Sequence, residues 1–264
     1  MPAMHCCQLV SYHEELNPSY RKTMEDRIKI IDGFMGNSKQ GFFAVYDGHG
    51  GMEVATFLQQ VLHQEIAKQI SVEESDCTIE KKLQRAYAVT DVMCCKSVAG
   101  FAGSTAITVL LLENEKHQRV LYTSNVGDSR AVLCHRGNAC RLSVDHLAIQ
   151  PEEVDRIIKC GGFVMHDRVL GVLAVSRSFG DRAFKNYVIA QPSTNVKIIE
   201  PVLDFPFLVI GCDGLWNEFE DQEIIDFVSS IEHSKRENAA KLLTGLVLEK
   251  NGDDNVTAVV IYIG

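Results

Sequence analysis

Residues 42–51 read Phe42-Phe43-Ala44-Val45-Tyr46-Asp47-Gly48-His49-Gly50-Gly51, an apolar run followed at once by an acid and glycines. Aromatic and β-branched residues in such a run are typical of a buried strand, and the glycines let the backbone turn sharply where that strand ends. The pattern therefore predicts a carboxylate at the end of a buried strand. The alternative interpretation is a plain turn in which Asp47 caps a following helix.

The same arrangement recurs along the chain. Asp213 closes the apolar run 207–212, Asp254 immediately precedes the run 256–263, and Glu25-Asp26 precedes a strand-like segment. Each of these acids, taken singly, is equally well explained by a surface turn. Burying unpaired charges is costly, and carboxylate oxygens suit magnesium and manganese, so the recurrence predicts a site for divalent cations. That interpretation makes the chain a metal-dependent hydrolase.

Composition narrows the class of protein. The chain has 264 residues, of which 46% are apolar and 23% charged, as expected of a globular protein with a sizeable core. Its formal net charge of −9 argues against a general nucleic-acid binder. No apolar run approaches the ~20 residues that a membrane-spanning helix needs. Because the candidate ligands run from residue 25 to residue 254 without a Pro/Gly/Ser-rich linker, residues 1–264 are expected to form a single domain.

Nine cysteines are present, an odd number, with no C-x-x-C spacing and no secretory signal at the start. A disulfide framework and a zinc site are therefore both disfavoured. Buried, reduced thiols in a cytoplasmic protein are the expected state, with the nucleus as a second compartment.

Apolar periodicity predicts an α+β fold in which antiparallel strands form the centre and amphipathic helices cover the outside. Short connections between 104–113, 119–126 and 130–135 indicate hairpins. The predicted strands are 28–32, 41–46, 104–113, 119–126, 130–135, 187–190, 207–212 and 255–263. The predicted helices are 51–70, 79–98, 151–160, 221–231 and 234–250, and residues 161–190 are expected to form an irregular surface segment.

Read together and in order, the motifs resemble the metal-dependent serine/threonine protein phosphatases of type 2C over residues 20–263. They are Arg21-x-x-Met24-Glu25-Asp26, Asp47-Gly48-His49-Gly50-Gly51, Gly103-Ser104-Thr105-Ala106, Asn125-Val126-Gly127-Asp128-Ser129-Arg130, Asp145-His146, Gly161-Gly162-x-Val164, Arg168 to Asp181, Cys212-Asp213-Gly214-Leu215-Trp216 and Asp254-Asn255-Val256-Thr257. One such motif is weak evidence, whereas nine in the family's order are specific.

The resemblance implies a central β-sandwich of two antiparallel sheets flanked by pairs of α-helices, with the metal site at one end. It also implies two Mg²⁺ or Mn²⁺ ions and a hydroxide that bridges them and attacks phosphorus without a covalent phosphoenzyme. The ligands carried over are Glu25, Asp26, Asp47, the Gly48 carbonyl, Asp213 and Asp254. Arg21 would bind phosphate through its planar fork, and His49 would protonate the leaving alkoxide.

The family's weaker third metal would use Asp128 and Asp213. The family places an aspartate just after the tryptophan, but this chain has Asn217 there, so weaker binding of that third ion is expected. Residues 161–182 resemble the family's variable flap, to which substrates and regulators dock; the role of Arg168 within it stays open.

The resemblance further implies that phosphorylated proteins are the substrates of a monomeric enzyme, with neither nucleic acid nor membrane as a partner. Two alternatives remain open. An inactive homologue could use the same surface to bind partners, and a phosphatase could act on small phosphorylated metabolites instead of proteins.

Overall fold

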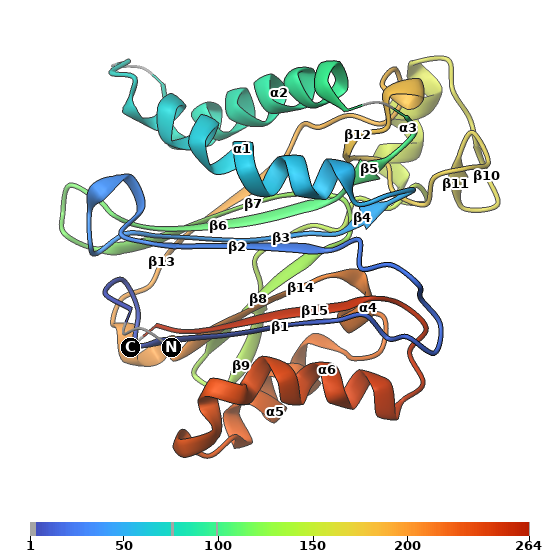
Figure 1. Ribbon diagram of the computed structural model, residues 1–264. Coiled ribbons are helices and arrows are strands. Elements are labelled where there is room, and N and C mark those ends of the chain that lie inside the picture. The colour runs from blue at the N-terminus through green and yellow to red at the C-terminus, as the bar shows by residue number, and fades with distance from the viewer. Residues whose placement is uncertain (1–3, 75–76, 99, 264) are drawn as a thin grey trace.

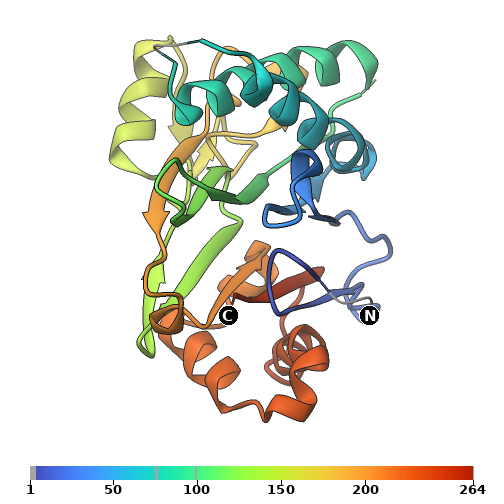
Figure 2. The same cartoon turned by 90° about the vertical axis from the view of Figure 1, so that its left-hand side faces the viewer.

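The structure, a computed structural model, describes residues 4–74, 77–98 and 100–263. Two β-sheets lie face to face, and helices cover the outer face of each, so the molecule has four layers (Figure 1). Figure 2 shows the same layers after a quarter turn. The expected α+β sandwich with flanking helices is confirmed.

The upper sheet in Figure 1 has the strand order β13-β7-β6-β3-β2, and all its neighbours are antiparallel. Its strands are β2 Arg27–Asp32, β3 Gly41–Tyr46, β6 Ala106–Glu113, β7 Arg119–Val126 and β13 Ser193–Ile198. The lower sheet has the antiparallel order β1-β15-β14-β8-β9. Its strands are β1 Leu9–Glu15, β8 Arg130–His135, β9 Asn138–Arg141, β14 Phe207–Gly211 and β15 Val256–Tyr262.

Helices α1 and α2 cover the upper sheet, and α5 and α6 cover the lower one (Figure 1). Their bounds are α1 Glu53–Ser71, α2 Ile79–Ser97, α5 Asp221–Ser230 and α6 Ala239–Glu249. The shorter helices are α3 Pro151–Lys159 and α4 Asp213–Trp216, with 3-10 turns η1 Phe34–Gly36, η2 Arg182–Phe184, η3 Val202–Asp204 and η4 His233–Asn238. No helix among the described residues is both long and apolar enough to cross a membrane.

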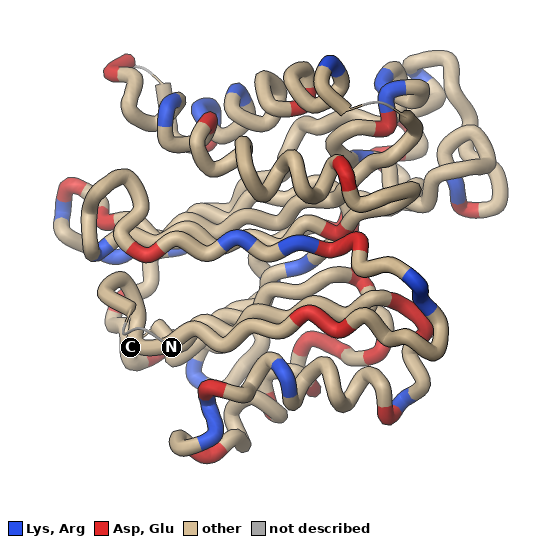
Figure 3. Tube along the Cα trace, viewed as in Figure 1, with Lys and Arg blue, Asp and Glu red and all other residues tan. Residues whose placement is uncertain are grey.

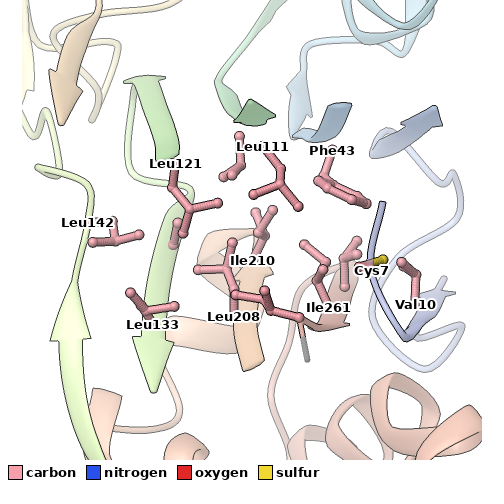
Figure 4. Close-up of a cluster of buried hydrophobic side chains, with 14 of the residues drawn as sticks. Cys7, Val10, Phe43, Leu111, Leu121, Leu133, Leu142, Leu208, Ile210 and Ile261 are labelled. Atoms are coloured by element: carbon pink, nitrogen blue, oxygen red, sulfur yellow. The ribbon is translucent and has the colours of Figure 1, made fainter. Parts of the chain in front are cut away.

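The strand β3 shows why its sequence is apolar without interruption. Phe43 and Val45 belong to the core between the two sheets, whereas Phe42, Ala44 and Tyr46 pack under α1 and α2. Because side chains alternate between the faces of a strand, both faces of β3 are buried. Figure 4 shows the core between the sheets, where Phe43 and Leu111 from one sheet face Leu208 and Ile261 from the other.

Small elements complete the end of the sandwich that carries the acidic motifs. A three-stranded sheet has the order β12-β5-β4, formed by β4 Gly48–His49, β5 Gly103–Ser104 and β12 Phe179–Gly180. A hairpin pairs β10 Val164–Met165 with β11 Arg168–Val169 inside the irregular segment expected at 161–190. The side chain of Arg168 is directed back onto that hairpin, where it donates to the Val172 carbonyl at 2.8 Å.

Several predicted features need correction. The connection from 113 to 119 forms the expected hairpin, but 119–126 and 130–135 do not pair, because β7 lies in the upper sheet and β8 in the lower one. The predicted strand 104–113 is divided between β5 and β6. Residues 187–190 form no strand: Val188 is buried against α3 and the hairpin, so the apolar character reflects packing of an irregular segment. The last helix begins at Ala239 rather than at 234, because 233–238 form a 3-10 turn. The strands β1, β9 and β13 were not predicted from the sequence; each is an edge strand of its sheet and carries many polar residues.

Candidate metal centre

Strand pairing brings the predicted acids to one end of the upper sheet. Asp26 immediately precedes β2, and Asp47 immediately follows β3. Since Arg27 is paired with Tyr46 across these antiparallel strands, the two aspartates lie at the same end.

The lower sheet delivers three more acids to the same end. Asp213 follows β14 and Asp254 precedes β15, and Gly211 pairs with Ala258 between them. Asp128 lies two residues before β8, whose first residue, Arg130, also pairs with Gly211. Acidic positions from both sheets therefore gather where the sheets end, on the right in Figure 3.

The carboxylates are close enough to share ions. Oxygen atoms of Asp47, Asp128 and Asp213 all lie within 4.8 Å of one another. Asp26 and Asp47 form a second such group with the thiol of Cys212. Asp47 belongs to both groups, so it stands between two possible cation positions. Within the described residues neither group includes Glu25 or Asp254, which lie further out.

The electrostatics of the centre favour a bound cation. Burial raises the pKa of Asp26 to about 7, and the charges of Asp213 and Asp254 act in the same direction. Burial likewise raises the pKa of Asp128 to about 7 and that of Asp47 well above its usual range, with neighbouring aspartates adding to both. The Oδ2 atom of Asp26 is buried and has no hydrogen-bond partner among the described residues. This orphaned oxygen and the predominance of carboxylates around it fit magnesium or manganese.

Glycine is required at position 48 by space. A Cβ atom there would lie 2.6 Å from the backbone oxygen of Glu25, which is closer than real Cβ contacts come. The end of β3 is also held in place by a hydrogen bond of 2.9 Å, which the Thr105 amide donates to the Asp47 carbonyl. The turn at Asp47-Gly48 therefore lies tightly against both the Glu25 segment and β5.

Glu25 is anchored by both backbone and side-chain groups. Its carboxylate accepts hydrogen bonds from the amide of Gly51 and the hydroxyl of Thr23, both at 3.1 Å. Its own amide donates to the side chain of Asn255 at 3.0 Å, and Asn255 also donates to the Leu16 carbonyl. Asn255 thus ties the N-terminal acidic pair to the C-terminal one.

Arg21 lies at the edge of the centre. One guanidinium nitrogen is 2.5 Å from Asp254 Oδ2, and Nε donates to the Asp253 carbonyl at 3.1 Å. The side chain is still 46% exposed, so part of its fork faces solvent and can bind an anion.

His49 is held by a residue for which the sequence indicated no role. Its Nε2 atom lies 2.8 Å from Oδ2 of Asp181, whose side chain is fully buried. A Cβ at position 103 would overlap both the Asp181 carboxylate and the His49 ring, so Gly103 makes room for this pair. Asp181 stands in a recognised motif, but nothing local in the sequence indicates that it contacts His49.

Three further residues of the centre were quoted in motifs without a role. Cys212 lies beside Asp26. The hydroxyls of Thr105 and Ser129 share a buried hydrogen bond of 2.7 Å, in which either can donate, and Thr105 also accepts a hydrogen bond from the Asp47 amide. Asn217, where an acid was expected, donates to Asp213 Oδ2 at 3.4 Å. In contrast, Asp145 pairs with Arg130 at 2.6 Å and therefore acts as a structural group.

Comparison with known proteins places this architecture in a family. The family model for protein phosphatase 2C matches residues 11–256. The protein named protein phosphatase 2C homolog 1 of Saccharomyces cerevisiae is 34% identical, with 96% of this chain and 93% of that protein covered. The protein of the same name in Schizosaccharomyces pombe is 36% identical, with 97% and 73% covered.

Solved structures show the same fold. A crystal structure of serine-threonine phosphatase 2C from Toxoplasma gondii superimposes with a TM-score of 0.84 at 21% identity, covering 97% of this chain and 94% of that one. The fold and the acidic centre define a metal-dependent serine/threonine protein phosphatase. The chain belongs to the protein phosphatase 2C family.

Proposed function

We propose that the chain hydrolyses phosphoserine and phosphothreonine in proteins at a centre of two divalent cations, without forming a covalent phosphoenzyme. The observation that carries this is the position of Asp47, which belongs to both groups of potential ligand atoms. When bound, two such ions would lower the pKa of a coordinated water toward ~7 and neutralise charge on the phosphoryl group. Asp26, Asp47, Asp213 and Asp254 would hold the ions, together with the Gly48 carbonyl and Glu25.

The chain's own side chains supply substrate binding and proton transfer. Arg21, oriented by its contacts with Asp254 and the Asp253 carbonyl, would bind two phosphate oxygens with its remaining guanidinium hydrogens. His49, fixed by Asp181, would donate a proton to the departing serine or threonine oxygen. Asp128 together with Asp213 would hold a weaker third ion, next to which Asn217, bonded to Asp213, supplies a neutral amide in place of a carboxylate.

We also propose that residues 1–264 act as one catalytic domain and as a monomer. The reason for a single domain is that Glu25 is held by Asn255, so residues from both ends of the chain are needed to assemble one centre.

The test is release of phosphate from a phosphothreonine peptide with Mn²⁺, with Mg²⁺ and with EDTA, comparing the native chain with Asp254→Ala. We expect turnover that requires metal and is lost in the variant, with circular dichroism showing that the variant is folded. A folded, metal-loaded native chain without turnover would support the inactive binding homologue instead. Faster turnover of sugar phosphates than of phosphopeptides would support the metabolite phosphatase.

A further inference from the structure

A groove of about 1130 Å³ lies on the helical side of the upper sheet, between α2 and the segment 182–191. Its lining contains five basic residues and one acid, Asp91, although the whole chain is acidic with a net charge of −9. The basic residues are Lys81, Arg85, Lys96, Arg182 and Lys185.

The basic residues on the helix recur at the spacing of one face. Lys81, Arg85 and Lys96 line the groove together with Ala88 and Val92, which lie between them at helical intervals. Figure 3 shows basic positions recurring along α2. Val92 is 54% exposed, so this face combines uncovered apolar surface with positive charge.

Most of this charge is not neutralised locally. Lys185 pairs with Asp91 at 3.0 Å, and Arg85 pairs with Glu74 at 2.7 Å. Within the part of the chain that the structure describes, Lys81, Lys96 and Arg182 have no carboxylate within 4 Å of their side-chain nitrogens. A groove with three uncompensated cations attracts an anionic partner and disfavours a basic one.

The groove and the metal centre share a wall. The carboxylate of Asp91, which lines the groove, accepts a hydrogen bond from the Gly180 amide at 3.0 Å. The next residue, Asp181, contacts His49 of the candidate centre, and the residue after that, Arg182, lines the groove. The segment Gly180 to Arg182 therefore borders the groove and also carries the residue that contacts the proposed general acid.

We propose that this groove binds an acidic segment of the protein substrate, lying near the phosphorylated serine or threonine. The inference rests on the proposed function, because it names the class of phosphoprotein that the centre prefers. Lys81 and Lys96 are 15 positions apart on α2, which corresponds to about 22 Å of helix and to roughly seven residues of extended peptide. The matching ligand is a short segment with several Asp or Glu residues and an apolar side chain for the surface around Val92.

The variant that tests the groove is Lys81→Gln/Lys96→Gln, because both side chains are exposed and neither is a candidate metal ligand. The matched control is Lys235→Gln/Lys241→Gln, which removes two exposed positive charges from the opposite helical layer. A fluorescent, phosphate-free acidic peptide of about seven residues is titrated in EDTA by anisotropy, so that binding is measured without catalysis. Since each exposed charge pair contributes modestly, we expect the groove variant to bind the peptide about two- to tenfold more weakly than the native chain, and the control to bind it unchanged. Peptide binding by the native chain should also weaken as the salt concentration rises.

The second measurement is kcat/KM with Mn²⁺ on two phosphothreonine peptides, one with acidic flanks and one with the same acids replaced by Asn and Gln. The native chain and the control should prefer the acidic peptide, and the groove variant should lose that preference while hydrolysing p-nitrophenyl phosphate at the native rate. Equal preference in the native chain and the groove variant overturns the proposal. If the peptide binds through the groove but no phosphopeptide is hydrolysed, the proposed function is wrong, whereas binding of acidic segments by the groove is supported.

Discussion

Nε2 of His49 and Oδ2 of Asp181 lie 2.8 Å apart although 132 positions separate the two residues in the chain. Asp181 is fully buried, and its Oδ2 atom also accepts a hydrogen bond from the hydroxyl of Ser178. This second contact helps to hold the carboxylate in place next to the imidazole. His49 is 30% exposed, which leaves its ring accessible from the solvent side. A buried carboxylate behind a partly exposed imidazole is the arrangement that orients a general acid toward its substrate.

We expect His49→Gln to slow hydrolysis of alkyl phosphates much more than that of aryl phosphates. An alkoxide leaves poorly without a proton, whereas a phenolate with a low pKa leaves without help, and general acids typically contribute about 10²–10⁴-fold. The measurement is kcat on a phosphoserine peptide and on p-nitrophenyl phosphate. Equal slowing on both substrates would contradict the role.

Asp181→Asn should reproduce the same substrate-dependent loss in weaker form, because it disturbs the residue that positions His49. Asparagine keeps the shape of the side chain and tolerates the left-handed backbone at this position, where φ is 45°. In the double variant the two losses should be clearly less than multiplicative, since both act on one group. Fully multiplicative losses would show that Asp181 acts independently of His49.

Arg21→Ala should mainly raise KM, by about tenfold, if charged hydrogen bonds to phosphate contribute ~1.5 kcal/mol. Arg21→Lys keeps the positive charge but lacks the planar fork, so it distinguishes the effect of the charge from that of the fork geometry. We therefore expect the lysine variant to recover only part of the loss. Initial rates over a range of phosphopeptide concentrations check this, and an unchanged KM in both variants would refute phosphate binding by Arg21.

The sequence predicted the end of the fold that carries the acids better than it predicted the edges of the sheets. The run 42–46 is apolar because both faces of β3 are buried, so its pattern alone identified a central strand. In β13, by contrast, residues such as Asn195 and Val196 are exposed at a sheet edge, and its pairing depends on β7, far away in the chain. Local composition could not reveal a strand whose hydrogen bonds are all made with distant residues.

The same distinction holds for the candidate site. Asp47 and Asp213 were found because each follows an apolar strand, a signal that neighbouring residues carry. Asp181 was not assigned a role, because its partner is brought to it by the small sheet of β4, β5 and β12. The anchoring of Glu25 by Asn255 likewise depends on two chain ends meeting in the folded protein.

Asn217→Asp should strengthen binding of the third ion. The amide now faces Asp213 at 3.4 Å, and a carboxylate in its place would add a charged oxygen ligand beside Asp128 and Asp213. Because ligand charge tunes the affinity for hard cations, we expect the Mn²⁺ concentration needed for the weakest binding step to fall severalfold. Calorimetric titration of the metal-free chain measures this. Asn195→Asp, an exposed charge on β13, is the control and should leave the titration unchanged.

Without metal, the acidic centre should make stability decrease as the pH rises. In the folded chain burial raises the pKa of Asp128 to about 7, with the charge of Asp213 adding to it, whereas an unfolded aspartate titrates near ~3.9. Between these values the folded state binds more protons than the unfolded state, so this carboxyl costs stability progressively from about pH 4 to pH 7. Removing its charge should therefore stabilise the metal-free chain at pH 8 and much less at pH 5.

Asp128→Asn in EDTA should accordingly raise the melting temperature by several degrees at pH 8, with a smaller gain at pH 5. The contrasting variant is Asp32→Asn at the other end of the molecule. Partial burial opposes ionisation there, but hydrogen bonds from the Cys6 and His5 amides outweigh it and lower the pKa of Asp32. Its charge is stabilising at both pH values, so this variant should lose stability at pH 5 and pH 8 alike. Thermal unfolding followed by circular dichroism distinguishes the two; a gain for Asp128→Asn that does not grow with pH would show that its carboxylate is not repelled in the metal-free centre.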